Sequence, residues 1–238
     1  MPLIVADCNI PLFLKDRVLL DFRGQKYDTG LKSLLELLGV STEPKDKSIV
    51  IYEKELKQAE KIKDIAKISF ALSELGNSYR DVGDFKKAIP YYKRLLKLEK
   101  KRDNKVGEAA CYANLGIVYN NLGDFTLAIK YHEKALDKSL QFGDKLSQAK
   151  SLVNLGNAYY GLGNYRKALP NYEASLEITK QIGYTEGIIA CLTVEANLYQ
   201  SLGDFKKAIQ FNQEALSFAG KMSWKNVQAT ILNNLGKI

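Results

Sequence analysis

Few residues of this chain could carry out covalent or metal chemistry. His132 is the only histidine among 238 residues, so a serine or cysteine nucleophile would have this one side chain as its base. Cys8, Cys111 and Cys191 are too few and too scattered for a disulfide framework or a zinc site. The sequence also lacks a G-x-x-x-x-G-K-[ST] phosphate-binding loop. These residue types predict that the chain is not an enzyme and has no catalytic residue, cofactor or metal site.

Asparagine is the polar residue that recurs at a regular spacing. Two sets lie in phase with a period of 40 residues, the first being Asn114, Asn154 and Asn234 and the second Asn77, Asn157 and Asn197. An amide offers hydrogen-bond donors and an acceptor, so it can pair with the main chain of an extended peptide whatever that peptide's side chains are. The chemistry on offer is therefore recognition, provided that the fold places these amides on one surface.

The whole sequence repeats with this period. The segment 75–79 (LGNSY) returns at 115–119 (LGIVY) and 155–159 (LGNAY), and in weaker form at 195–199 (EANLY). A second block, Gly83-Asp84-Phe85, keeps the same register in the three later copies, each followed by alanine and then isoleucine or leucine. Self-similarity at a fixed period is typical of proteins built from stacked supersecondary units that share one core.

Each unit has the pattern of a helix–turn–helix. Apolar residues at helical spacing lead up to Gly83, which can adopt the left-handed conformation that ends a helix. Asp84 is placed to cap the second helix, and Gly76 and Ala88 are small where two helices must approach closely. Pro90, which has a counterpart in Pro170, predicts a kink or a late start of the second helix.

These motifs resemble the tetratricopeptide repeat family, although the period usual for that family is about 34 residues. The 40-residue period resembles the long-helix arrays of G-protein-signalling modulators, kinesin light chains and bacterial repeat proteins. HEAT and armadillo repeats have a similar length, but the Gly-Asp-Phe-x-x-Ala turn does not fit them. The resemblance implies an all-α fold, a right-handed superhelix (α-solenoid) of about four full repeats.

The period also predicts the domain boundaries. A solenoid is expected over 41–238, preceded by a small αβ segment over 1–40. The expected units are a degenerate repeat at 45–64, full repeats at about 66–104, 105–144, 145–184 and 185–224, and a partial repeat at 225–238.

Residues 1–40 read as two short strands and a helix, which is too little to form a core alone. The sequence DCNIP, FLKDR and DFRG, followed by a helix at 31–38, is similar to the end of bacterial TIR domains. An unrelated αβ cap on the solenoid is the alternative. In NAD-hydrolysing members of that family the catalytic glutamate lies further upstream, so the resemblance implies a fragment of a longer protein that cannot perform this reaction.

In tetratricopeptide arrays the first helix of each repeat lines the concave face. The resemblance therefore implies a peptide-binding groove formed by Asn77, Arg80, Asn114, Asn121, Asn154, Asn157, Tyr160, Asn197, Gln200 and Asn234. Similar asparagine ladders hold peptide main chains in kinesin light chains and G-protein-signalling modulators. The alternative is that these amides bridge neighbouring helices. His132 falls where other repeats have Tyr92 and Tyr172, which predicts a packing or surface role, and Cys111 and Cys191 fall at a small-residue packing position.

Composition limits the partners and the compartment. The net charge of +8 favours acidic partners through long-range steering, but the lysines are spread along the chain, which makes nucleic acid an unlikely partner. No apolar run approaches the roughly 18 residues that span a bilayer, and the N-terminus makes a poor signal peptide. A cytoplasmic protein without a small-molecule substrate is expected.

Three functions are compatible with these features. The first is an adaptor or scaffold that binds a peptide or protein in the concave groove. The second is the sensor or oligomerisation arm of a larger TIR–TPR signalling or defence protein, and the third is an electrostatic nucleic-acid binder, which would need its lysines on one face. Incomplete repeats at the ends could also drive self-association.

Overall fold

The structure is a computed structural model that describes residues 45–237. The sequence predictions for residues 1–40, including the TIR-like segment and Cys8, lie outside the described residues. The part described consists of ten α-helices and has no strand. The helices are α3 (Lys45–Lys61), α4 (Ile65–Asp81), α5 (Phe85–Lys101), α6 (Lys105–Asn121), α7 (Phe125–Phe142), α8 (Lys145–Gly161), α9 (Tyr165–Gln181), α10 (Thr185–Ser201), α11 (Phe205–Lys221) and α12 (Lys225–Leu235).

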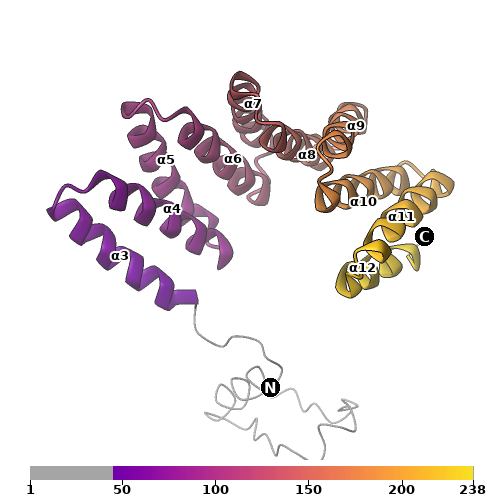
Figure 1. Ribbon diagram of the computed structural model, residues 1–238, viewed down its shortest axis with the longest axis horizontal. Coiled ribbons are helices and arrows are strands. Elements are labelled where there is room, and N and C mark those ends of the chain that lie inside the picture. The colour runs from indigo at the N-terminus through magenta and orange to yellow at the C-terminus, as the bar shows by residue number, and fades with distance from the viewer. Residues whose placement is uncertain (1–44, 238) are drawn as a thin grey trace, which may run out of the picture. The chain divides into compact units, whose positions relative to one another are not determined.

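The helices form a solenoid in which α4 to α12 each pack against their neighbours in sequence (Figure 1). Ile49 and Leu56 of α3 join a core cluster that includes Leu72 and Leu75 of α4. The even-numbered helices α4, α6, α8 and α10 are the first helices of the four full repeats, and α5, α7, α9 and α11 are the second helices. Successive first helices also contact one another, as α6 does α8 and α8 does α10. The all-α solenoid predicted from the repeat is therefore the observed fold.

The turn inside each repeat has the predicted chemistry. Gly83 takes a φ of +82°, which costs a residue without a Cβ little. The side chain of Asp84 then accepts a hydrogen bond from the main-chain N–H of Lys87 and so caps α5. The equivalent caps are Asp124, Asn164 and Asp204. Glycine and cap together fix where one helix ends and the next begins.

The two prolines do not interrupt the second helices. α5 begins at Phe85 and continues through Pro90, and its first turn is intact because the N–H of Ala88 donates to the carbonyl of Asp84. The predicted late start is wrong. Pro90 is exposed, so water can reach the carbonyl of Lys86 that the missing proline N–H would have bonded, which lowers the cost of the proline at this position.

One contact recurs in the first three full repeats. A glycine of the first helix lies against a buried ring of the second, and the pairs are Gly76 with Tyr92, Gly116 with His132 and Gly156 with Tyr172. The equivalent positions of the fourth repeat hold Ala196 and Asn212, both buried. A Cβ added to any of the three glycines would overlap the ring opposite. Alanine occupies this position only in the repeat where the second helix offers an asparagine instead of a ring.

We predict that Gly156→Ala lowers the free energy of unfolding by about 1–3 kcal/mol, because the new methyl group must displace the ring of Tyr172. Gly220→Ala is the matched control, since Gly220 lies within α11 with no atom near its Cβ position. It should be neutral or stabilising by up to about 1 kcal/mol through helix propensity. Urea unfolding measures both, and equal effects would contradict the close contact.

The fourth repeat contains a buried carboxyl group. Glu195 replaces the leucine of the Leu-Gly pair and is only 2% exposed, and its Oε1 has no hydrogen-bond partner in the described residues. Burial raises the pKa of Glu195 from its ordinary 4.5 to about 7, with Glu173 and Glu214 adding to the effect and Lys180 opposing it. Near neutral pH the fold must therefore hold a protonated glutamic acid or bear a buried charge.

We predict a pH dependence of stability that originates at Glu195. The folded state binds the proton more tightly than the unfolded state, so the free energy of unfolding should fall by about 2 kcal/mol as pH rises from about 4.5 to above about 7. Glu195→Leu, which copies the other repeats, should remove this decrease and raise the stability at pH 8. Chemical unfolding of both proteins at pH 5 and pH 8 tests this prediction, with Glu186→Gln as a control at an exposed position. If Glu195→Leu loses as much stability between the two pH values as the wild type does, the pH dependence does not originate at Glu195.

Candidate functional site: a groove along the first helices

Two of the predicted groove asparagines accept hydrogen bonds from buried tyrosines of the second helix. The Oδ1 of Asn77 accepts a hydrogen bond from the hydroxyl of Tyr92 at 2.8 Å, and Asn157 accepts one from Tyr172 at the same distance. The other two repeats have no tyrosine at this position. In the two repeats that have the tyrosine, the asparagine supplies the acceptor that its buried hydroxyl needs.

Other predicted residues link neighbouring first helices. A nitrogen of the Arg80 guanidinium donates to Asn114 at 3.3 Å, and the hydroxyls of Tyr160 and Ser201 lie 2.6 Å apart. Further along, Gln200 donates to the main-chain carbonyl of Lys237 at 3.4 Å. The alternative reading, in which polar residues of the ladder bridge adjacent helices, holds for these positions.

The remaining predicted residues differ in how they are placed. Asn121 is exposed and donates to the carbonyl of Ile117 in its own helix. The side chains of Asn154, Asn197 and Asn234 make no hydrogen bond within the described residues. Asn154 lines two hollows. It therefore combines an amide without a hydrogen bond and a place beside space that a ligand could enter.

The two hollows lie one repeat apart along the first helices. The first hollow, about 160 Å³, is enclosed by α6, α7 and α8 and is lined by Val106, Ala110, Ala113, Phe142, Lys150 and Asn154 among others. The second, about 350 Å³, lies among α8, α9 and α10, and its lining includes Lys150, Val153, Asn154, Tyr184, Gly187 and Ala190. Lys150 and Asn154 belong to both hollows and form the wall that they share. We call the two hollows and this wall the α8 groove.

The α8 groove combines apolar sides with a few charges. Asp144 contributes to the first hollow and Glu186 to the second, while Lys150 stands between them. The pKa of Asp144 is held below its ordinary value chiefly by the hydrogen bonds that it accepts from Ser147, so it stays ionised at neutral pH. Small apolar recesses beside an unused amide suit an extended segment that inserts side chains and pairs its main chain with Asn154.

Sequence reasoning missed most of the lining. The repeat motif draws attention to the residues around Leu-Gly, whereas the hollows lie about one turn earlier in each first helix. A signal was present in the small residues Ala110, Ala113, Gly187 and Ala190, which leave room between adjacent helices. Lys150 was missed because its equivalents, such as Phe70, Ala110 and Ala190, share no chemical type.

The histidine and the two described cysteines lie in the core. Burial raises the pKa of the Cys111 thiol to about 12 and also raises that of Cys191, whose sulfur lies 3.3 Å from the hydroxyl of Ser175. Burial lowers the pKa of His132 to about 4, so its ring is neutral at pH 7. Protonated thiols and a solvent-excluded imidazole fit the packing role predicted for these positions.

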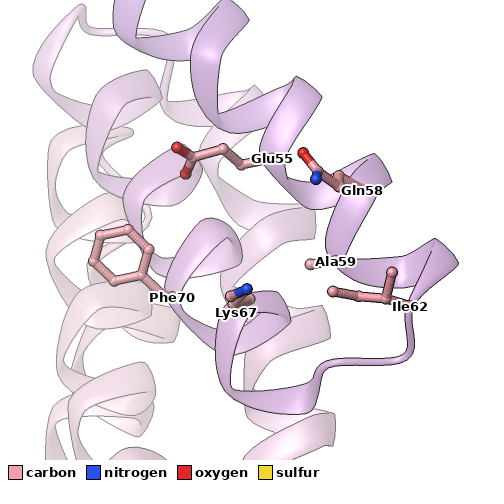
Figure 2. Close-up of a pocket in the computed structure, with 6 residues that line it drawn as sticks. All are labelled: Glu55, Gln58, Ala59, Ile62, Lys67 and Phe70. Carbon is pink, nitrogen blue, oxygen red and sulfur yellow. The ribbon is translucent and has the colours of Figure 1, made fainter.

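A further hollow lies between α3 and α4. Glu55, Gln58, Ala59 and Ile62 line it from one side and Lys67 and Phe70 from the other (Figure 2), around a volume of about 340 Å³. None of the predicted residues lines it, and its only amide belongs to Gln58. It is therefore a less suitable place for main-chain recognition than the α8 groove.

Fold and hollows together define a helical-repeat protein with recesses along its first helices. The family model described as tetratricopeptide repeat matches residues 67–141 and 147–221, which is more than half of the chain. The chain therefore belongs to the tetratricopeptide repeat family. No curated protein sequence matches the chain.

Solved structures resemble the fold. BtubC (BKLC) from P. vanneervenii matches with a TM-score of 0.69 at 19% identity, covering 82% of both chains. A Rap protein complexed with competence and sporulation factor matches with a TM-score of 0.70 at 14% identity, covering 89% of this chain and 62% of that one. A signal-transduction ATPase with a tetratricopeptide repeat sensor from Pyrococcus horikoshii matches with a TM-score of 0.66 at 19% identity, covering 88% and 34%. At such identities the likeness is one of fold.

The fold and the family do not test the predicted role as a sensor arm of a larger protein. The sensor-arm hypothesis rests on residues 1–40 and stays a prediction. Within residues 45–237 there is no cluster of side chains suited to a metal ion. The same residues include no helix with the length and apolar character needed to cross a bilayer.

We predict that asparagines at equivalent positions of the repeat differ in their effect on stability. Asn157→Ala leaves the buried hydroxyl of Tyr172 without its acceptor and should lower the free energy of unfolding by about 1–3 kcal/mol. Asn197→Ala removes an exposed amide at the same repeat position and should change it by less than about 0.5 kcal/mol. Chemical unfolding measures the stability of both variants. If neither substitution changed the free energy of unfolding, Asn157 would have no structural role.

Proposed function

We propose that the chain is a protein-interaction module that binds an extended segment of a partner protein in the α8 groove, and that it acts by binding instead of by catalysis. The observation that carries this proposal is Asn154: its half-buried amide makes no hydrogen bond within the described residues and stands on the wall between two hollows. An adaptor or scaffold role follows from such binding.

The spacing of the hollows limits the ligand. Packed helices lie about 8–10 Å apart, and an extended chain advances about 3.3 Å per residue. Apolar side chains about three residues apart would therefore reach neighbouring hollows. The main chain between them would pass Asn154, and an acidic side chain there would meet Lys150. The Rap protein, which has a similar fold, was solved in complex with competence and sporulation factor. That structure supports the proposal that a fold of this kind can recognise a partner.

We predict that a peptide selected from a random library by the wild-type chain binds in the α8 groove. Asn154→Ala should weaken the selected peptide by about three- to ten-fold, the effect of one lost hydrogen bond. Ala110→Trp should reduce affinity further, because the indole would occupy the first hollow from an exposed position. Isothermal titration calorimetry measures both variants.

The matched control for the filled hollow is Thr230→Trp, which places the same side chain at the equivalent exposed position of α12. This variant should bind as the wild type does. If Ala110→Trp and Asn154→Ala retain full affinity, the α8 groove is not the binding site.

A further inference from the structure

A second feature of the surface distinguishes α5 from the other second helices. This helix carries seven basic residues, Lys86, Lys87, Lys93, Arg94, Lys97, Lys100 and Lys101, and its only acidic residue is Glu99. Glu99 is buried, where its carboxylate accepts hydrogen bonds from Ser69 and Asn104. It therefore does not offset the charge on the exposed face of the helix.

The repeat supplies an internal comparison for this charge. Lys93, Lys97 and Lys101 are exposed and four residues apart, so they form one stripe along α5. We call these three residues the α5 stripe. The residues at the same positions are Glu133, Asp137 and Gln141 in α7 and Glu173, Glu177 and Gln181 in α9. Two of the three positions are thus reversed in charge in α5.

The α5 stripe lacks the side-chain hydrogen bonds that α7 and α9 form at the equivalent positions. In α7 the amide of Gln141 donates to Asp137 at 2.9 Å, and in α9 Gln181 donates to Glu177 at 3.2 Å. The α5 stripe instead places like charges at successive i,i+4 positions, which destabilises a helix by about 0.2–0.5 kcal/mol for each pair. None of its three lysines makes an ion pair within the described residues. An outside anion would relieve this repulsion.

Next to the α5 stripe lies an apolar hollow. It has a volume of about 240 Å³ and is lined by Ile68 and Leu72 of α4 and by Arg94, Lys97, Leu98 and Lys101 of α5. Two lysines of the stripe thus border aliphatic side chains. The α8 groove is lined by other residues, so the two surfaces are separate.

We propose that the α5 stripe and this hollow form a second docking surface, which binds an acidic segment of a partner protein that also carries an apolar side chain. Successive lysines of the stripe are about 6 Å apart along the helix axis. Carboxylates two residues apart in an extended segment, or four apart in a helix, match this spacing. The apolar side chain enters the hollow while the carboxylates meet Lys93, Lys97 and Lys101.

The hollow favours a protein segment over a nucleic acid. Single-stranded nucleic acid binds through charge together with bases stacked on aromatic rings. The hollow is lined by aliphatic and basic side chains and contains no ring. The nearby ring of Tyr91 is already stacked on Tyr79, with centroids 5.4 Å apart.

The experiment uses the full chain and three labelled probes in fluorescence anisotropy at low salt. The probes are a glutamate-rich peptide with interspersed leucines, a polyglutamate peptide of the same charge and a single-stranded oligonucleotide of the same charge. The leucine-containing peptide should bind most tightly, and its affinity should fall as salt is added. Equal or tighter binding of the oligonucleotide would overturn the assignment to an acidic protein segment.

Variants then locate the surface. Lys93→Glu with Lys97→Asp copies the residues of α7, so the helix tolerates it, and it should weaken the leucine-containing peptide about ten-fold or more. Lys93→Gln with Lys97→Ser copies α11 and should give a smaller loss. Lys206→Glu with Lys225→Glu makes the same change in net charge at exposed positions elsewhere and should keep the affinity within about two-fold.

Two outcomes would refute the proposal, unchanged binding by the α7-like variant or an equal loss in the charge-matched control. Circular dichroism and thermal unfolding confirm that each variant is folded. Asn154→Ala should leave this binding unaltered, which separates the α5 surface from the α8 groove.

Discussion

Close approach of the two helices within each repeat is the constraint on which the remaining structure depends. Gly76, Gly116 and Gly156 each face a buried ring of the second helix, with no room for a Cβ. The contact fixes the distance between the helices, and with it the positions of every residue that the first helix presents to its neighbours. In the fourth repeat the equivalent positions hold Ala196 and the buried Asn212, so a larger residue on the first helix goes with a smaller side chain on the second.

The same contact explains why the core of a solenoid can hold polar groups. A tyrosine ring fills the space between the helices, but its hydroxyl must find an acceptor, and Asn77 and Asn157 supply one. Where the ring is His132, the residue in register with Asn77 and Asn157 is Ile117, and the imidazole nitrogens have no partner in the described residues. Glu195 is a second departure from a purely apolar core. Such groups make the repeats chemically unequal although their main chains are alike.

Unequal repeats give the solenoid distinct surfaces. First helices separate at small residues, and this separation creates the α8 groove on either side of Lys150 and Asn154. Second helices present their exposed sides independently of the groove, and only α5 carries an uncompensated row of lysines. A repeat protein can therefore offer two docking surfaces of different chemistry with no change in fold, because exposed positions do not take part in the contact that sets the helix spacing.

The sequence alone determined the helices, the turns and the order in which they stack. Glycine at 83 and a cap at 84, repeated every 40 residues, specify local conformation through φ and main-chain hydrogen bonding, and both act within a few residues. Only the tertiary structure decided which asparagines are available. Asn157 and Asn154 are three residues apart in one helix, yet the first binds Tyr172 and the second lines the hollows. Whether an amide is satisfied depends on side chains brought close by the packing of other helices, and periodicity along the chain carries no record of those distances.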